Sequence, residues 1–392
     1  MTNNKSTLLA LCLPILLVAC APEQDLSEKI IARAGEQLSA QCQAIDATGT
    51  FINPKSFHEG KVVYIPLDDW CSGFFPGTLL EMYRLTGDST WLRRGLEYTE
   101  QLDSIKHIKW HHDVGFMTMS CFGQAWRITH NPAYRDVIIT AAQSLSTRFR
   151  PVSGVLQSWD EDRGWQGTRG WMCPTIIDNM INLELLFEAT ELSGDSTFRT
   201  IAISHADTTM KYHFRSDYST CHVVDYDKVK GGIRSRCAAQ GYSDSSCWSR
   251  GEAWALYGYA LCYRYTGNEK YLDQCRHVYG YIFNNPNMPA DLVPYWDYNA
   301  PDIPNAYRDA SAAAVMASAL YELSTWIPEY RQTADHIIES LASDAYLAKA
   351  GENGNFILMH SVGSIPHGNE IDAPLNYADY YLLEALCRKN NK

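Results

Sequence analysis

A short motif that ends one apolar helix and starts the next recurs along the chain. Its copies are Thr86-Gly87-Asp88, Thr129-His130-Asn131-Pro132, Ser193-Gly194-Asp195, Thr266-Gly267-Asn268 and, more weakly, Ser324-Thr325-Trp326-Ile327-Pro328. A Gly or Asn just past a helix end supplies a left-handed cap, and an aromatic residue follows a few positions later, so the next helix starts at once. Each copy therefore predicts a tight hairpin of two helices.

Two further helices complete the pattern. A first helix over Leu26 to Gln43 and a last helix over Pro374 to Arg388 can pair with each other, which gives six antiparallel pairs and brings the chain ends together. The spacing of the copies is too irregular for a solenoid of fixed short period. We therefore predict an all-α fold, an (α/α)6 barrel with the first helix of each pair inside, whose long loops converge at one mouth.

One of these loops has the character of β-structure. Thr220 to Tyr226 and Gly232 to Arg236 are rich in strand-forming residues, and a polar turn, Asp227 to Gly231, separates them. This pattern predicts a small β-hairpin folded over the barrel mouth.

The N-terminal sequence has the pattern of a targeting signal. Lys5 supplies a positive charge, and Leu8 to Val18 form an apolar run too short to span a bilayer. The run ends in Leu17-Val18-Ala19-Cys20, which resembles a bacterial lipobox. We predict a lipoprotein signal peptide over residues 1–20, lipidation of Cys20 as the only membrane attachment, and a single catalytic domain over 21–392. A periplasmic or cell-surface lipoprotein, anchored in the outer membrane, is expected.

Charge and motif content exclude several classes of partner. A net charge of −12 argues against nucleic acid and against electrostatic binding to anionic membranes. There is no nucleophile elbow, phosphate-binding loop or dinucleotide fingerprint, so no cofactor is expected. The cysteines show no C-x-x-C spacing and no zinc pattern, and no metal is expected. A local disulfide between Cys237 and Cys247 stays open.

Polar residues lead the six expected inner helices, and apolar residues follow. These starts are Asp68-Asp69-Trp70, His111-His112-Asp113, Thr175-Ile176-Ile177-Asp178, Trp248-Ser249-Arg250, Tyr307-Arg308-Asp309 and Glu370-Ile371-Asp372. Helix capping alone explains many of these aspartates, and Thr175-x-x-Asp178 fits a capping box. Asp113 and Asp178 would nevertheless lie on neighbouring helices at the same end, where two carboxylates can divide the roles of acid and base.

Trp248-Ser249-Arg250-Gly251-Glu252-Ala253-Trp254 is the most specific stretch. Aromatic side chains at a barrel mouth stack on sugar rings, and an arginine can bind a carboxylate or sulfate through two N–H groups. The alternative is that both tryptophans belong to the core and that Arg250 pairs with an aspartate. Further tryptophans are expected at the same rim: Trp70, Trp159, Trp165 and Trp171.

Five ordered motifs resemble those of the unsaturated glucuronyl hydrolases, glycoside hydrolase family 88. They are the stretches beginning at His112, Ile176, Trp248 and Pro294 (with Arg308 to Ala313 after it), and the closing stretch Tyr377 to Ala385. The resemblance covers the chain after the signal. It implies an (α/α)6 barrel that removes 4,5-unsaturated uronic acid from the non-reducing end of lyase-generated glycosaminoglycan oligosaccharides, of the heparin/heparan, chondroitin or hyaluronan type, by hydrating the C4=C5 vinyl ether.

The resemblance also implies roles for single residues. Asp178 matches the proton donor that also activates water, and Asp113 matches the second essential carboxylate. Substrate-binding positions are matched as follows: His112, His222 and Gln240 as polar groups, Trp70, Trp159, Trp248 and Trp254 as aromatic walls, and Arg250 in the pocket motif.

The chain departs from the family pattern at three places. It has Ala239-Gln240 where His-Gln is frequent, Glu252 where Gln is frequent, and an apparent insertion over Glu161 to Trp171. Arg163 or Arg169 in this insertion could meet a sulfate on the neighbouring sugar, or could simply be exposed loop cations. The sequence leaves two alternative functions: an unsaturated rhamnogalacturonyl hydrolase acting on pectin fragments, which the Trp-x-Arg-Gly-x-Ala-Trp pattern disfavours, and a non-catalytic glycan-binding lipoprotein, which would not need both carboxylates.

Overall fold

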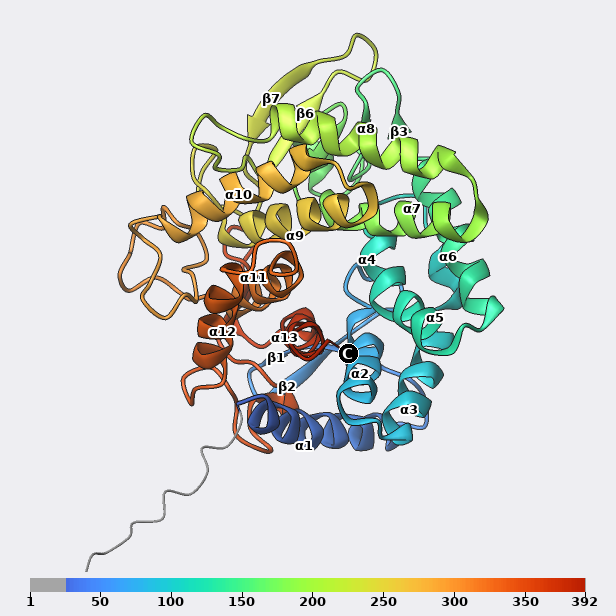
Figure 1. Ribbon diagram of the computed structural model, residues 1–392, viewed down its shortest axis with the longest axis vertical. Helices are drawn as coiled ribbons and strands as arrows, with labels where there is room; N and C mark the ends of the chain where they lie inside the picture. Colours follow the sequence, from blue (N-terminus) through green and yellow to red (C-terminus); the bar gives the residue numbers. More distant parts are fainter. Residues whose placement is uncertain (1–25, 392) are drawn as a thin grey trace, which may run out of the picture.

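The computed structural model describes residues 26–391 and shows a closed ring of helices in two layers (Figure 1). The inner layer consists of α2 (Phe74–Thr86), α4 (Val114–Thr118) continued by α5 (Gln124–Thr129), α7 (Asn179–Ser193), α9 (Ser249–Thr266), α11 (Ala310–Leu323) and α13 (Asn376–Lys389). Each inner helix packs against the next, and α13 packs back against α2. The ring is therefore closed.

The outer layer surrounds the inner helices, and its N-terminal helix, the predicted partner of α13, packs mainly against α2 (Figure 1). The outer layer consists of α3 (Ser89–Glu100), α6 (Pro132–Ser146), α8 (Ser196–Tyr212), α10 (Glu269–Phe283), α12 (Tyr330–Leu341) and the N-terminal α1 (Leu26–Asp46). Short 3-10 turns, η1 (Asp103–His107), η3 (Gln166–Thr168) and η4 (Asn353–Asn355), lie in the connections. The predicted (α/α)6 barrel, with the first helix of each pair inside, is confirmed.

The inner helices are buried on all sides, because they face both the barrel axis and the outer layer. Every residue of α11 is buried, and its many alanines let neighbouring helices approach closely. A π-helical turn, η2 (Met119–Gly123), joins α4 to α5 and lies against α2. At Gly77 a Cβ atom would lie 2.1 Å from the carbonyl oxygen of Ser120, so only glycine permits this approach.

The hairpin turns are built as the sequence predicted, with two differences. Gly87, Gly194 and Gly267 cap their helices in the left-handed conformation. In the second copy the left-handed residue is His130, at φ 51°, while Asn131 accepts the N–H of Ala133 and caps the following helix. The weaker copy has no left-handed cap, because Ser324 stays in the right-handed region.

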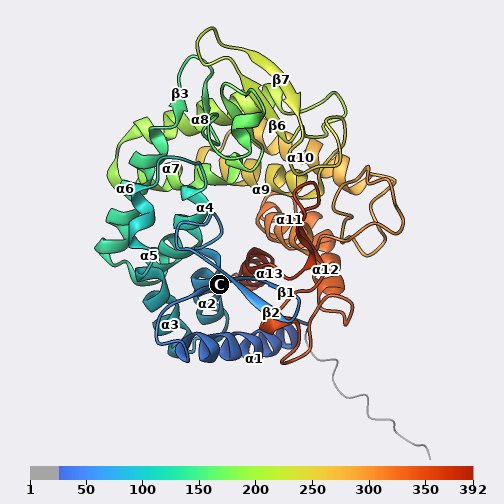
Figure 2. The same ribbon diagram turned by 180° about the vertical axis from the view of Figure 1, so that it is seen from behind.

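The predicted β-hairpin is present at the mouth and has a third strand. Strands β6 (Val223–Tyr226) and β7 (Ile233–Cys237) pair antiparallel, and β5 (Pro174–Ile176) adds to the other edge of β6. Three further hairpins were not predicted: β1 (Asn53–His58) with β2 (Lys61–Ile65), β3 (Phe149–Arg150) with β4 (Val155–Leu156), and β8 (Ser361–Ser364) with β9 (Asn369–Ala373). Figure 2 shows β1 and β2 lying across the ring beside α2 and α13.

One local expectation is wrong, and the open question of a disulfide is answered. Glu370-Ile371-Asp372 does not start an inner helix but belongs to β9, and α13 begins only at Asn376. Cys237 and Cys247 are free thiols, and the Cys247 thiol donates a hydrogen bond of 2.7 Å to Oε1 of Glu252. The signal peptide and Cys20 lie outside the described residues. Within residues 26–391, no helix combines the length and apolarity needed to cross a bilayer.

Candidate active site

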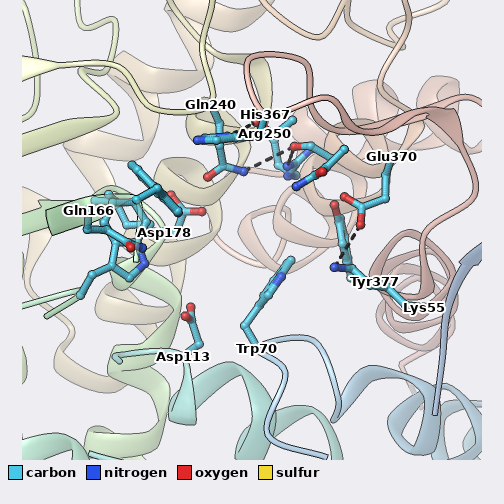
Figure 3. A pocket seen from close by; sticks show the side chains of 16 residues that line it. Lys55, Trp70, Asp113, Gln166, Asp178, Gln240, Arg250, His367, Glu370 and Tyr377 are labelled. Carbon is cyan, nitrogen blue, oxygen red and sulfur yellow. Dashed lines mark hydrogen bonds and ion pairs between the residues drawn. The ribbon is translucent and has the colours of Figure 1, made fainter. Parts of the chain in front are cut away.

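A cavity of about 340 Å³ opens at the barrel mouth, where the inner helices begin (Figure 3). Side chains from the helix starts, from the loop before α7 and from the β1 and β8–β9 hairpins surround it. The lining residues are Lys55, Trp70, Asp113, Trp159, Trp165, Gln166, Ile176, Asp178, Gln240, Arg250, Gly363, Ser364, His367, Asn369, Glu370 and Tyr377. The long loops thus converge at one end, as predicted.

Asp113 and Asp178 both line the cavity, and each stands directly before an inner helix, yet neither side chain caps that helix. Asp309, at the same place before α11, does cap: its carboxylate accepts the N–H groups of Ser311 and Ala312. Thr175 donates its hydroxyl to the carbonyl of Leu156 instead of forming a capping box. The capping interpretation of Asp113 and Asp178 is therefore wrong, and their carboxylates are available to a ligand.

Two histidines lie against the Asp113 carboxylate. Nδ1 of His111 and Nε2 of His112 each lie 3.3 Å from one of its oxygens, and Nδ1 of His111 also accepts the backbone N–H of Asp113 at 3.1 Å. Burial by itself raises the pKa of Asp113, but His112, His111 and Arg148 together hold it below the ordinary value. Burial also lowers the pKa of His112, whose Nδ1 contacts the amide of Asn182 at 3.2 Å. His112 is fully buried, so it supports Asp113 from behind and does not line the cavity.

His222 approaches Asp178 from the β6 side. Its Nδ1 accepts two backbone N–H groups, those of Ala239 and Gln240, at 3.2 and 3.1 Å. A nitrogen that accepts hydrogen bonds carries no proton, so in the neutral ring the proton is assigned to Nε2. Nε2 lies 3.5 Å from Oδ2 of Asp178. The backbone at Gln240 thus sets the tautomer that faces the acid, while the Gln240 side chain lines the cavity.

Only some of the tryptophans that were predicted to contact substrate line the cavity. Trp70 and Trp159 line the cavity, and Trp159 forms a cluster with Trp165 and Trp171 whose ring centroids lie 5.1 to 5.9 Å apart. Trp254, by contrast, is buried in the core against Phe116 and Tyr381. Trp248 is also buried, between the Arg250 guanidinium and the His222 ring, and does not line the cavity.

Arg250 borders the cavity but is committed to buried partners. Its guanidinium bonds to Asp309 at 2.8 Å and to the carbonyl of Gly363 at 2.6 Å, and it also donates to the carbonyl of Val362. The two tryptophans in the core and the Arg250–Asp309 pair match the alternative that the sequence left open. The arginine joins α9, the start of α11 and β8 into one wall.

The insertion lies beside a second, shallower hollow next to the first. Arg163 lines this hollow, which shares Trp70, Asp113 and Trp159 with the main cavity. Arg169 instead lies over the rings of Trp165 and Trp171, at 5.6 and 5.3 Å. Among the described residues, no group of three or more His, Cys, Asp or Glu side chains is arranged to hold a metal ion.

Most of the chain matches a known protein family. Residues 52–388 match the family described as Glycosyl Hydrolase Family 88. The chain belongs to glycosyl hydrolase family 88. The unsaturated glucuronyl hydrolase of Formosa agariphila is 42% identical to this family 88 chain over 98% of the chain and 97% of its own length. That of Bacillus sp. strain GL1 is 32% identical, covering 84% of this chain and 89% of its own.

Solved structures agree with this assignment. A crystal structure of an unsaturated glucuronyl hydrolase specific for heparin superposes on this family 88 barrel with a TM-score of 0.88 and 42% identity. The alignment covers 94% of this chain and 98% of that one.

Several residues that line the family 88 cavity were missed by sequence reasoning: Lys55, Gln166, Ser364, His367 and Asn369. They lie on β1, η3 and the β8–β9 hairpin, or in loops between these elements, which carried no motif. Tyr377 was quoted only as part of the closing helix, and Glu370 only as a helix start. The sequence did carry a signal for Tyr377, because this residue begins the closing motif Tyr377 to Ala385, and in the structure its ring lies 5.4 Å from the Arg250 guanidinium.

Proposed function

We propose that this protein is an unsaturated glucuronyl hydrolase that removes a 4,5-unsaturated uronic acid from the non-reducing end of lyase-generated glycosaminoglycan oligosaccharides. The observation that carries the proposal is the pair Asp113 and Asp178. Both carboxylates face one cavity bordered by Trp70 and Trp159, and neither is used to cap its helix. The related enzymes of Formosa agariphila and Bacillus bear the same activity in their names.

The chemistry proposed is hydration of the vinyl ether, not direct displacement at the anomeric carbon. Asp178 gives its proton to C4, and the positive charge that develops at C5 is shared with the ring oxygen. A water molecule adds to C5 while the Asp178 carboxylate accepts one of its protons. The resulting hemiketal opens to a ketone, the hemiacetal at C1 then collapses to an aldehyde, and the remaining saccharide leaves with a free hydroxyl. One water is consumed, and Asp178 ends protonated again.

The neighbouring side chains support this sequence. Asp113, held ionised by His111 and His112, is suited to accept hydrogen bonds from the sugar hydroxyls. The Nε2–H of His222 faces Oδ2 of Asp178, the proposed proton donor. Rules that infer stereochemistry from the separation of two carboxylates do not apply to this pair, because C1 is not attacked.

Further binding roles follow from placement at the cavity. We assign Trp70 and Trp159 to the faces of the sugar, and the Gln240 side chain to the polar edge. Arg250, with its partner Asp309, shapes the wall. His112, Trp248 and Trp254 act from behind, by fixing Asp113, His222 and Phe116.

The test is loss of the C4=C5 absorbance on a panel of unsaturated disaccharides from heparin, chondroitin and hyaluronan, with pectin-lyase products as the comparison. We expect turnover of at least one glycosaminoglycan disaccharide and little turnover of the pectin products. Turnover of pectin products alone would instead identify a rhamnogalacturonyl hydrolase. Binding without any turnover would indicate a glycan-binding protein.

We also propose that the chain is a lipoprotein of the periplasm or cell surface, attached to the outer membrane through a lipid on Cys20. The support is the apolar run that ends in the lipobox-like Leu17-Val18-Ala19-Cys20. Cells fed labelled palmitate should yield a labelled membrane-bound protein. The Cys20→Ala variant should lose the label, and a variant that keeps it would refute the assignment.

A further inference from the structure

The two cations that line the cavity differ in how tightly they are paired with carboxylates. Its lining includes three carboxylates, those of Asp113, Asp178 and Glu370, while Lys55 and Arg250 are the lysine and arginine that line it among the described residues. A substrate that carries a carboxylate, and in some cases a sulfate ester, must find a cation here, because the chain as a whole is negative. Such a cation must be able to exchange its present carboxylate partner for the substrate anion.

Arg250 is not free. The Asp309 carboxylate that it contacts is fully buried, and that same carboxylate caps α11 through the N–H groups of Ser311 and Ala312. Two backbone carbonyls of β8 take further N–H groups of Arg250. Separating a buried, hydrogen-bonded ion pair is costly, because both charges lose their partners out of contact with water.

Lys55 has an exchangeable partner. Its Nζ lies 3.0 Å from Oε1 of Glu370, and the two side chains are 15% and 22% exposed. Asp69 is farther, at 3.9 Å, and its other oxygen accepts the N–H and thiol of Cys71. This pair is more exposed than the Arg250–Asp309 pair, whose side chains are 2% and 0% exposed, so an arriving anion can replace Glu370 at lower cost than it could replace Asp309.

The position of Glu370 is imposed by its strand. Its backbone has φ 45°, in the left-handed region, which a residue other than glycine rarely adopts. Across the hairpin stands Gly363, where a Cβ atom would lie 2.1 Å from Oε2 of Glu370. The missing side chain at Gly363 therefore makes room for the Glu370 carboxylate to lie beside Lys55.

Lys55 also stands in the right place for a ligand. Figure 3 shows Asp113 and Asp178 on one side of the cavity and the Lys55–Glu370 pair on the other, with Trp70 between them. A sugar that lies on Trp70 with its reacting carbons beside Asp178 would extend toward Lys55.

We propose that Lys55 is a substrate-binding residue that binds an anionic group of the oligosaccharide. In the free enzyme the Glu370 carboxylate occupies the position of this anion. This inference rests on the proposed function. The anion has two possible sources: the carboxylate of the unsaturated uronate, which every substrate carries, or a sulfate ester on the neighbouring sugar. Both are recognised by the same contact, a charge-assisted hydrogen bond from Nζ.

The test compares two variants whose effects have opposite signs. Lys55→Met keeps the length of the side chain but removes the charge, and it should raise KM roughly tenfold with kcat nearly unchanged, the effect of one lost hydrogen bond to a charged group. Glu370→Gln removes the competing anion and should lower KM by roughly threefold, since the net cost of exchange falls. Lys55→Arg should stay close to wild type.

Each variant is measured on a matched pair of unsaturated disaccharides, with and without sulfate on the neighbouring sugar. An equal rise in KM for both substrates with Lys55→Met assigns the contact to the uronate carboxylate, and a rise for the sulfated one alone assigns it to the sulfate. Lys270→Met, which removes a similar lysine–carboxylate pair on α10, is the matched control and should not change KM.

Two results would overturn the inference. One is an unchanged KM in Lys55→Met on both substrates. The other is a rise in KM in Glu370→Gln, since a purely structural ion pair would be damaged alike from either side. Failure of the wild-type enzyme to act on any unsaturated disaccharide would instead refute the proposed function, so the two failures are distinguishable.

Discussion

The Nε2 atom of His222 lies 3.5 Å from Oδ2 of Asp178, and neither atom has a hydrogen-bond partner among the described residues. Both side chains are nearly buried, at 3% exposed for His222 and 12% for Asp178. Leaving two buried polar atoms unpaired costs about 1–3 kcal/mol each, so such a pair is expected where a ligand completes the contacts. A substrate or water oxygen between the cavity and this pair would meet both a donor and an acceptor.

The Asp178→Asn variant tests the role of this carboxylate. The amide is nearly the same size, but it can neither give a proton to C4 nor accept one from water. We expect kcat to fall by roughly 10²–10⁴-fold, the usual contribution of a general acid–base group, with KM changed much less. Loss of C4=C5 absorbance measures the rate. Asp195→Asn, which alters a helix cap remote from the cavity, is the control, and a variant of Asp178 with wild-type kcat would disprove the assignment.

Local signals made the scaffold predictable. Asp88 and Asn268 each cap a helix through a neighbouring N–H, and the left-handed glycines precede them, so each turn is encoded within a few residues. The same local pattern made Asp113 and Asp178 ambiguous, because an aspartate before a helix can be either a cap or a site residue. Asp309 has a similar place before its helix and does cap, and only the tertiary structure shows which aspartates point into the cavity.

The missed part of the site depends on contacts distant in sequence. Lys55 meets Glu370 only because β1 packs beside β9, more than three hundred residues later in the chain. Neither hairpin has a long alternating pattern, and Glu370 adopts a backbone conformation that its residue type does not favour. For two tryptophans the sequence predicted too much. Trp248 and Trp254 belong to the most specific motif and were expected to contact substrate, yet both are buried behind the cavity wall.

Arg250→Met should mainly reduce stability. The variant leaves the Asp309 carboxylate buried without its cation and removes the hydrogen bonds that Arg250 donates to the carbonyls of Val362 and Gly363. We expect the free energy of unfolding to fall by about 3–5 kcal/mol, as measured by urea denaturation. Arg163→Met, in an exposed part of the insertion, should change it by less than about 0.5 kcal/mol. Equal stabilities for the two variants would show that the Arg250–Asp309 pair does not hold the wall.

Glu184 joins three inner helices at the base of the barrel, opposite the mouth. Its Oε1 accepts hydrogen bonds from Arg127 of α5 and Arg264 of α9, at 2.8 and 2.7 Å. Because Glu184→Gln removes a buried charge shared by Arg127 and Arg264, whose side chains are themselves about one third exposed, we expect the free energy of unfolding to fall by about 1–2 kcal/mol. Glu97→Gln removes only exposed surface pairs and should change it by well under 1 kcal/mol. A similar, small loss in both variants would contradict the structural role.

Glu252 should make stability depend on pH in a direction opposite to most acids. Burial raises the pKa of its carboxyl to about 7, although the Cys247 thiol and the Thr220 N–H both favour the charged form. The unfolded chain therefore releases this proton near pH 4.5 while the folded chain keeps it to about pH 7. Across that window the wild-type stability falls as pH rises, by up to about 1.4 kcal/mol per pH unit from this group.

The Glu252→Gln variant isolates this effect, because an amide does not titrate. Its unfolding free energy, relative to wild type, should increase steadily between pH 4.5 and about 7 and then stay constant. Urea denaturation of both proteins at several pH values measures the difference. Since the two proteins share every other titrating group, a difference that stays flat or falls across this window would mean that Glu252 is ionised in the folded state and that Cys247 and Thr220 outweigh its burial.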